Sequence, residues 1–468
     1  MGSLMVQGAS SSAGKSLITT ALARALRRRG LDVVPFKAQN MSNNARVVSG
    51  GEIGTAQYLQ ALAAGVEPDV RMNPVLVKPE GDNRSQVIIL GAPDPALSGL
   101  PWRSRGRLLW SVIEQSLQQL LAAHEVLLIE GAGSPAETNL RDTDLANMRT
   151  AQAARARVLL VADIDRGGAF AHLYGTWAML AQAERALLSG FALNKFRGDP
   201  ALLPPAPEDL QRLTGVPTLG VIPWLHHGLP DEDGAATPRP TEFRPSVAVV
   251  RYPTASNLDE FKLLEQVVDL RWAARPEDLG RSDLVILPGS KHVAADLAWL
   301  RQTEIAEAVI ARAALGRPVL GICGGLQMLG ERIEDESGVD GSADGLGLLP
   351  LRTTFKASKL AESISCAFNE LPSPWAALSG GSFRGYQIRH GSTVAVGPAV
   401  EALPDGLGYA RDTVLAVYAH GMLEEATVLA SLFGARPQRT LDQAFEELAD
   451  AIEEHLDVSF LLREAGIA

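Results

Sequence analysis

The chain has 468 residues, of which 46% are hydrophobic and 21% are charged, a balance that is typical of globular domains and excludes wholesale disorder. At roughly 150 residues per domain, this length predicts about three domains or two large ones. The formal charge of −11 at pH 7 argues against sequence-independent binding to nucleic acid or to an anionic membrane.

The cysteine content and the apolar runs bear on the compartment. Two cysteines, Cys323 and Cys366, are too few for a disulfide framework and suit a reducing environment. No apolar run reaches the ~18–20 residues that span a bilayer, and the N-terminal apolar stretch 4–6 is too short for a signal peptide. We therefore expect a cytoplasmic protein with no membrane and no nucleic-acid partner. The sequence carries no signal for an oligomeric state.

Short apolar runs alternate with longer amphipathic segments, a pattern typical of α/β domains with parallel strands. In the first half, strands are predicted at 3–7, 33–36, 87–90, 126–130, 158–163, 190–193 and 218–222, with helices at 16–29 and 108–122. Residues 228–245 contain four prolines and no sustained apolar period, which indicates a linker. In the second half, strands are predicted at 246–252, 284–287, 319–322 and 414–418, with an amphipathic helix over 441–456.

The phosphate-binding candidate lies at the N-terminus. The first predicted strand runs into a loop of small residues that includes Gly8, Ser12 and Gly14, and Lys15 and Ser16 then open a helix. Backbone N–H groups of such a loop, together with the helix N-terminus, bind phosphates. Lys15 is expected to contact the terminal phosphates of ATP, and the Ser16 hydroxyl to ligate Mg²⁺. Five residues rather than the usual four separate the two glycines.

A carboxylate that could complete this site stands at the end of another strand. The run 126–130 ends in Glu130 and is followed by a Gly-Ala-Gly turn. Because ligands of open parallel sheets gather at the carboxyl ends of the strands, Glu130 is predicted to hold Mg²⁺.

Two further strand ends carry polar groups. Asp163, Asp165 and Arg166 follow one strand and are predicted substrate contacts, while Asn194 follows the next and is predicted to bind the nucleotide base. Each such group alone is more often a loop stabiliser or a helix cap. Together they predict one polar rim.

A second candidate centre surrounds Cys323. The stretch 321–325 reads Gly-Ile-Cys-Gly-Gly between a predicted strand and a predicted helix, which is the sharp turn that exposes a nucleophile. A helix N-terminus favours the thiolate, and the N–H of Gly324 can donate to an oxyanion. His420 follows another strand and is the predicted proton-transfer partner. Cys366 has no such frame and is predicted to be structural.

Three stretches of the second half are similar to class I, triad-type glutamine amidotransferases, which are flavodoxin-like. They are the oxyanion loop 287–290, which contains Gly289, the nucleophile turn 321–325 and residues 418–421. The third catalytic residue of that family is often a Glu two places after the histidine, where this chain has Met422. Glu424, two places further on, is not assigned a role.

The first half resembles dethiobiotin synthetase and its relatives, whose phosphate loop has the same longer spacing. More specific strings resemble the cobyric acid synthase family, and they lie at 36–44, 50–54, 72–79, 130–137, 139–142, 162–168 and 385–391. This resemblance covers nearly the whole chain. One position departs from the pattern, because Gln387 stands where the family often has Glu.

The resemblance implies a P-loop synthetase domain at 1–229, a linker at 230–245 and an amidotransferase domain at 246–468 that includes the C-terminal helix. It also implies amidation of carboxylates b, d, e and g of adenosylcobyrinic acid a,c-diamide with L-glutamine and ATP. ATP would activate each carboxylate as an acyl phosphate, with Lys37 as a further phosphate contact. The asparagine-rich loop with Asn40 and Asn43 is predicted to bind the corrinoid.

Three alternatives stay open at this point. Cobyrinic acid a,c-diamide synthase performs the same chemistry on other carboxylates, although the asparagine-rich loop and the string 72–79 favour the first reading. A switch ATPase of the ParA/MinD type would leave the turn around Cys323 unexplained, and glutaminase activity would distinguish it. In the third alternative, Cys323 is inactive.

Overall fold

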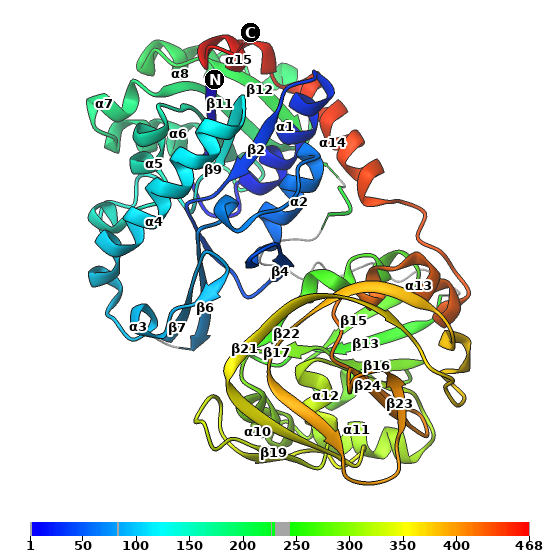
Figure 1. Ribbon diagram of the computed structural model, residues 1–468. Helices are drawn as coiled ribbons and strands as arrows, with labels where there is room; N and C mark the ends of the chain where they lie inside the picture. Colours follow the sequence, from blue (N-terminus) through cyan, green and yellow to red (C-terminus); the bar gives the residue numbers. More distant parts are fainter. Residues whose placement is uncertain (1, 82–83, 226, 230–243, 468) are drawn as a thin grey trace.

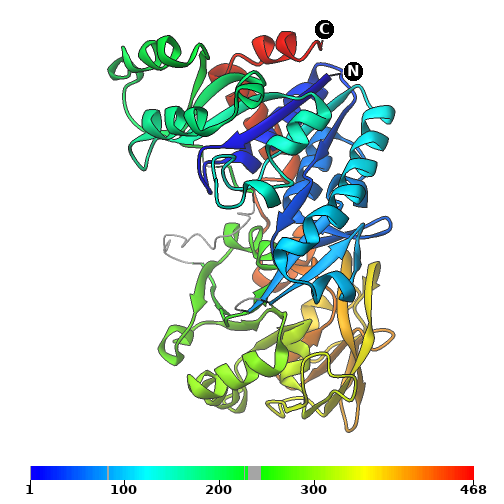
Figure 2. The same cartoon turned by 90° about the vertical axis from the view of Figure 1, so that its left-hand side faces the viewer.

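The computed structural model describes residues 2–81, 84–225, 227–229 and 244–467. Two α/β domains lie against each other, and both ends of the chain lie on the first (Figures 1 and 2). Most of the predicted linker, residues 230–243, falls outside the described residues. Within the described part of the chain, no helix combines the length and the apolarity needed to cross a membrane.

The first domain is built on a parallel sheet of six strands. In spatial order these are β12 (Thr218–Pro223), β11 (Leu188–Phe196), β10 (Arg157–Asp163), β1 (Gly2–Gly8), β9 (Val126–Glu130) and β2 (Val33–Phe36). Alternate side chains point to opposite faces, so that Leu4 and Val6 enter one apolar core and Met5 enters the other. The parallel α/β fold predicted for this half is confirmed.

Helices cover both faces of this sheet (Figure 1). One core contains α1 (Lys15–Arg28) and most of the apolar residues of α2 (Thr55–Ala64). The other contains α4 (Trp102–Ala123), α5 (Met148–Ala154), α6 (Ala169–Met179) and α8 (Ala206–Thr214). The short helices α3 (Pro95–Ser98) and α7 (Gln182–Arg185) also belong to this part of the chain.

One predicted strand of this half belongs to a different sheet. The run 87–90 lies mostly in β7 (Arg84–Ile89), which pairs antiparallel with β6 (Val75–Gly81). With β3 (Gln39–Met41) and β8 (Ala92–Pro93) they form a sheet of four strands, and β4 (Ala45–Val48) pairs with β5 (Gly51–Gly54). Adjacent strands joined by a short turn pair antiparallel, which is why this run does not enter the parallel sheet. Figure 1 places β4, β6 and β7 at the edge that faces the second domain.

The second domain has a sheet of seven strands. In spatial order they are β15 (Asp269–Ala273), β13 (Ser246–Val250), β16 (Leu284–Leu287), β18 (Val319–Ile322), β25 (Val414–Val417), β24 (Gly408–Arg411) and β23 (Val400–Leu403). The first five are parallel, and the last two are antiparallel additions.

Helices and smaller sheets surround this second sheet. The helices are α9 (Pro276–Leu279), α10 (Val293–Gln302), α11 (Ile305–Ala314), α12 (Gly324–Leu329) and α13 (Ala426–Phe433). A four-stranded sheet contains β20 (Ala343–Asp344), β19 (Arg332–Glu334), β21 (Leu351–Ala367) and β22 (Ser382–Ala395), and β14 (Ala255–Ser256) pairs with β17 (Gly289–Ser290).

The C-terminal helix differs from the domain prediction, which placed it in the second domain. The chain returns to the first domain, where α14 (Leu441–His455) packs along α1 and α15 (Val458–Glu464) lies beside the central strands (Figure 1). Phe445 and Leu448 enter the apolar core that contains α1. Arg24 of α1, which is buried, binds Asp442 and Glu446 of α14. The amphipathic pattern predicted this helix and its apolar face. It could not predict that this face packs against α1 of the first domain.

We expect Phe445→Ala to lower the free energy of unfolding of the first domain by about 3–5 kcal/mol, because it empties a fully packed position. Leu441→Ala, on the same helix but 40% exposed, should change it by no more than about 0.5 kcal/mol. Urea unfolding followed by circular dichroism checks both values. Equal effects of the two variants would contradict the packing of α14 on this core.

Candidate functional site

A pocket of about 1010 Å³ lies between the two domains. The phosphate-loop residues Ser12, Gly14, Lys15 and Ser16, together with Lys37, Asn40, Asn43 and Asn194, line it from the first domain. Tyr252, Leu258 and Trp272 line it from the second. The pocket thus joins the carboxyl ends of the first sheet to a wall that the second domain supplies.

The loop that follows β1 has the backbone of a phosphate cradle. Gly14 has a φ of +98° and precedes α1 directly. A side chain there would collide with the Asn194 amide, which donates to the carbonyl of Ala13 at 2.9 Å. Asn194 therefore braces the loop, and its contact with a base stays a prediction. Ser12 stands in the same loop with a φ of +57°.

Lys15 is folded over the same loop. Its ammonium donates to the carbonyls of Ser10 and Gly133 at 3.3 and 3.2 Å. Gly8 lies directly below, and a Cβ at Gly8 would lie 3.0 Å from the Lys15 ammonium.

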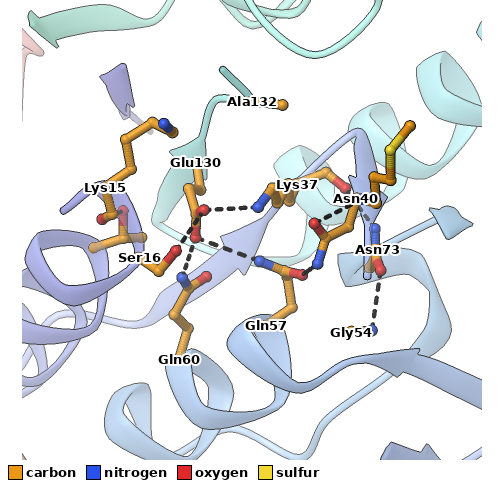
Figure 3. A network of polar contacts seen from close by, with 12 residues as sticks. Lys15, Ser16, Lys37, Asn40, Gly54, Gln57, Gln60, Asn73, Glu130 and Ala132 are labelled. Atoms are coloured by element: carbon orange, nitrogen blue, oxygen red, sulfur yellow. Dashed lines mark hydrogen bonds and ion pairs between the residues drawn. The ribbon is translucent and has the colours of Figure 1, made fainter. Parts of the chain in front are cut away.

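Glu130 is fully buried at the end of β9 and accepts hydrogen bonds from four side chains (Figure 3). Oε1 accepts from Ser16 at 2.9 Å and from the Lys37 ammonium at 2.8 Å. Oε2 accepts from Gln60 at 2.5 Å and from Gln57 at 3.4 Å. Lys37 thus supplies the charge that a buried carboxylate requires.

The Ser16 hydroxyl and the Glu130 carboxylate fit Mg²⁺. They are hard oxygen donors that already lie 2.9 Å apart beside the loop. Mg²⁺ at nucleotide sites is held by one or two protein oxygens, with phosphates and waters completing the octahedron. Among the residues the structure describes, no group of three or more His, Cys, Asp or Glu side chains could hold a metal ion.

The predicted substrate residues divide into two groups. Asn40 and Asn43 line the pocket, and the Asn40 amide donates to Gln57 at 3.1 Å, which connects the asparagine-rich loop to Glu130. Asp163, Asp165 and Arg166 lie on the rim, where Asp163 binds the Lys195 ammonium at 2.9 Å. These three are not among the described residues that line the pocket, and their contact with substrate stays a prediction.

Cys323 occupies the predicted sharp turn between β18 and α12. Its φ of +52° and ψ of −103° are strained for a residue with a side chain, and such strain is typical of functional sites. The turn depends on Gly325, because a Cβ there would collide with the carbonyl of Leu287. The Cys323 N–H bonds to the carbonyl of Val417 at 2.8 Å, which fixes the turn to the strand that precedes His420.

His420 and Glu260 are both fully buried beside this thiol. The His420 Nδ1 lies 3.0 Å from Glu260 Oε1, and the N–H of Gly421 donates to Glu260 Oε2 at 3.1 Å. Burial opposes protonation of the imidazole, but the Glu260 carboxylate and the Cys323 thiol together raise the pKa of His420 to about 10. The site is therefore arranged to favour a protonated His420 beside the Cys323 sulfur.

The two predicted oxyanion glycines lie on either side of the same centre. Gly289 is packed so closely that a Cβ would lie 3.0 Å from His420 Cε1. A Cβ at Gly324 would lie 2.6 Å from the backbone nitrogen of Ser290. The two loops therefore approach each other next to the thiol.

Glu260 is the functional residue that sequence reasoning missed. It lies on the short helix η4 (Leu258–Phe261), far along the chain from His420. The only available signal was an Asp-Glu pair in the loop after the first strand of the second domain. Met422, at the position of the usual third residue, is buried, and the carboxylate comes from another element.

Comparisons with known proteins agree with both halves of this description. Residues 4–228 match the model of the CobQ/CobB/MinD/ParA nucleotide binding domain, and residues 246–428 match that of the CobB/CobQ-like glutamine amidotransferase domain. A nucleotide-binding domain and a glutamine amidotransferase domain in one chain define a glutamine-hydrolysing, ATP-dependent amide ligase.

Relatives that match nearly the whole chain show which amide ligases this protein resembles. The chain is 53% identical to the cobyric acid synthases of Polaromonas sp. (strain JS666 / ATCC BAA-500) and Variovorax paradoxus (strain S110). Each alignment covers 98% of this chain, with 97% of the first relative and 98% of the second. The chain belongs to the cobyric acid synthase family. This assignment favours cobyric acid synthesis over the diamide synthase and switch-ATPase alternatives.

We expect Glu260→Gln to lower kcat/KM for glutamine hydrolysis about 100-fold, a typical effect of impaired proton transfer. The carboxylate raises the pKa of His420, so its removal lowers that pKa and moves the alkaline limb of the pH profile to lower pH. Glutamine hydrolysis measured between pH 6 and 10.5 tests both effects. An unchanged alkaline limb would contradict the pairing of Glu260 with His420.

We expect Glu130→Gln to lower ammonia-supported amide synthesis about 100-fold or more, because the variant loses the charge that faces Lys37 and the phosphate loop. Glutamine hydrolysis by the same variant serves as the internal control and should change less than about 3-fold. A loss of glutamine hydrolysis equal to the loss of synthesis would show that Glu130 acts on the fold as a whole.

Proposed function

We propose that this chain converts carboxylates b, d, e and g of adenosylcobyrinic acid a,c-diamide to amides, using ATP and L-glutamine. The observation that carries the proposal is one pocket between a phosphate loop with a buried carboxylate and the domain that contains Cys323, His420 and Glu260. Family membership supports the substrate class. The pocket, about 1010 Å³, has room for ATP.

The first step activates a carboxylate. A carboxylate oxygen of the corrinoid attacks the γ-phosphorus of ATP, and ADP leaves, which gives an acyl phosphate. Lys15 would exchange its carbonyl contacts for phosphate oxygens and balance their charge. Mg²⁺, when bound by Ser16 and Glu130, supplies positive charge to the phosphates. Asn40 and Asn43 would donate to the amide and carboxylate oxygens along the corrinoid periphery.

Ammonia arises in the second domain. The Cys323 thiolate attacks the side-chain amide carbon of glutamine, and N–H groups near Gly289 and Gly324 would stabilise the oxyanion. The imidazolium of His420 gives a proton to the departing nitrogen, and Glu260 holds the ring in position. Water then cleaves the glutamyl thioester. Ammonia attacks the acyl phosphate in the first domain, the amide C–N bond forms, and phosphate leaves.

The two free thiols indicate the cellular compartment in which the protein works. Cys323 and Cys366 are both buried free cysteines that form no disulfide, which suits a reducing compartment. This supports a cytoplasmic enzyme.

We expect the purified protein to add successive amides to adenosylcobyrinic acid a,c-diamide in the presence of ATP, Mg²⁺ and glutamine. Cys323→Ala should abolish the glutamine-supported reaction. The reaction with ammonium should persist, because free ammonia replaces the product of glutamine hydrolysis and only the synthetase domain is needed. Product mass over time checks both. Cys366→Ala, the matched control at the other buried thiol, should retain glutamine-supported synthesis.

Two outcomes would contradict the proposal. ATP hydrolysis with no change in corrinoid mass would exclude this substrate. Equal glutamine-supported synthesis by Cys323→Ala and the unmodified protein would exclude Cys323 as the nucleophile.

A further inference from the structure

Arg46 of the first domain is buried against the second domain. It lies on β4, directly after the asparagine-rich loop, and is 6% exposed. Its Nη2 donates to Asp259 Oδ2 at 2.5 Å, its Nη1 donates to Glu424 Oε2 at 2.7 Å, and Nη2 also contacts Glu424 Oε1. Burial opposes the charge of Arg46, but Asp259 and Glu424 keep its pKa above the ordinary value. Both carboxylates belong to the other domain.

The two carboxylates that Arg46 binds adjoin two residues of the proposed glutaminase centre. Asp259 precedes Glu260 on η4, and Glu424 lies on η7 (Met422–Glu424), which follows His420 and Gly421. Short helices such as these have few internal hydrogen bonds, so their positions depend on outside contacts. Arg46 therefore joins the segment that carries Glu260 to the segment that carries His420.

Tyr386 provides a third connection to the same histidine. The Arg46 guanidinium lies 5.3 Å from the centre of the Tyr386 ring. That ring stacks on the His420 imidazole, with ring centres 5.2 Å apart and planes 19° apart. Asn257 donates both to the Tyr386 hydroxyl at 2.8 Å and to the carbonyl of Ala45 at 2.9 Å. The Tyr386 ring thus packs on the face of the His420 imidazole. Arg46 contacts this ring directly, and Ala45 is connected to its hydroxyl through Asn257.

We propose that Arg46 is a positioning residue of the glutaminase centre, supplied by the synthetase domain, which holds Glu260 and His420 in register through Asp259, Glu424 and Tyr386. This inference rests on the proposed role of Cys323 in glutamine hydrolysis. It makes the second domain dependent on the first for full glutaminase activity.

The same strip of the first domain borders the nucleotide pocket. Asn44, two residues before Arg46, lines the pocket and accepts a hydrogen bond from the N–H of Leu258 at 3.2 Å. Thr55 also lines the pocket and donates to Asp259 Oδ2 at 3.3 Å. Ligands that move these pocket residues will therefore act on the segment that carries Glu260.

The test compares Arg46→Met and Arg46→Lys with Arg24→Met and Arg24→Lys. Arg24 is an equally buried arginine, 4% exposed, whose partners Asp442 and Glu446 lie on α14. The measured quantities are kcat and KM for glutamine hydrolysis, ammonia-supported amide synthesis, and the midpoint of thermal unfolding.

Arg46→Met should lower kcat for glutamine hydrolysis about 10- to 100-fold, because a small misplacement of catalytic groups has effects of this size. KM for glutamine and ammonia-supported synthesis should change less than about 3-fold. Arg46→Lys keeps the charge but not the paired donors, and should restore part of kcat. The two Arg24 variants should lower the unfolding midpoint without this loss of kcat.

Two results would overturn the inference. One is a kcat for glutamine hydrolysis within about 2-fold of that of the unmodified protein in both Arg46 variants. The other is a loss of kcat in Arg24→Met that equals the loss in Arg46→Met. If Arg46→Met does not fold, Glu424→Gln, which keeps an acceptor for Arg46 but removes one charge, must lower kcat while ammonia-supported synthesis persists. A lack of glutamine hydrolysis by the unmodified protein would instead contradict the proposed function.

Discussion

The relative position of the two domains depends on a buried cation that crosses between them. A guanidinium can remain buried only where carboxylates compensate its charge, and Arg46 finds them in Asp259 and Glu424 of the other domain. A second crossing contact is similar, because Lys359 of β21 and Lys78 of β6 both bind the buried Glu52. These pairs hold the edge of the first domain against the second.

The same electrostatic requirement organises each site. Glu130 is compensated by Lys37, and Glu260 by the imidazolium of His420. In both domains the buried carboxylate also contacts a polar group of the site, namely the Ser16 hydroxyl in the first and the His420 imidazole in the second. Polar side chains at the carboxyl ends of parallel strands meet at one edge of a sheet. Contact between the domains then places residues of the second domain, such as Leu258, against the pocket at the edge of the first sheet.

The strands and the local motifs could be predicted because they depend on neighbouring residues. Four predicted strands agree with the structure at both ends, namely 33–36, 126–130, 284–287 and 319–322. Each is a short apolar run bounded by other residue types, which restricts where the strand can begin and end. The turn around Cys323 and the loop before Lys15 were likewise visible as local patterns.

Long-range pairings could not be read in this way. Glu260 binds His420 across 160 positions, and Arg46 binds Glu424 across 378. Neither pairing leaves a periodic or local signal. The C-terminal helix shows the same limit, since its apolar face was evident but its partner α1 lies more than 400 residues away.

The proposed function implies that ammonia released at Cys323 is used at the phosphate loop before it mixes with the solvent. The most direct measurement supplies glutamine labelled with ¹⁵N in the side-chain amide together with an excess of unlabelled ammonium, and determines the isotope in the new corrinoid amides by mass spectrometry. The account predicts amides that are almost entirely ¹⁵N. Amides with the isotope ratio of the bulk ammonium would contradict it.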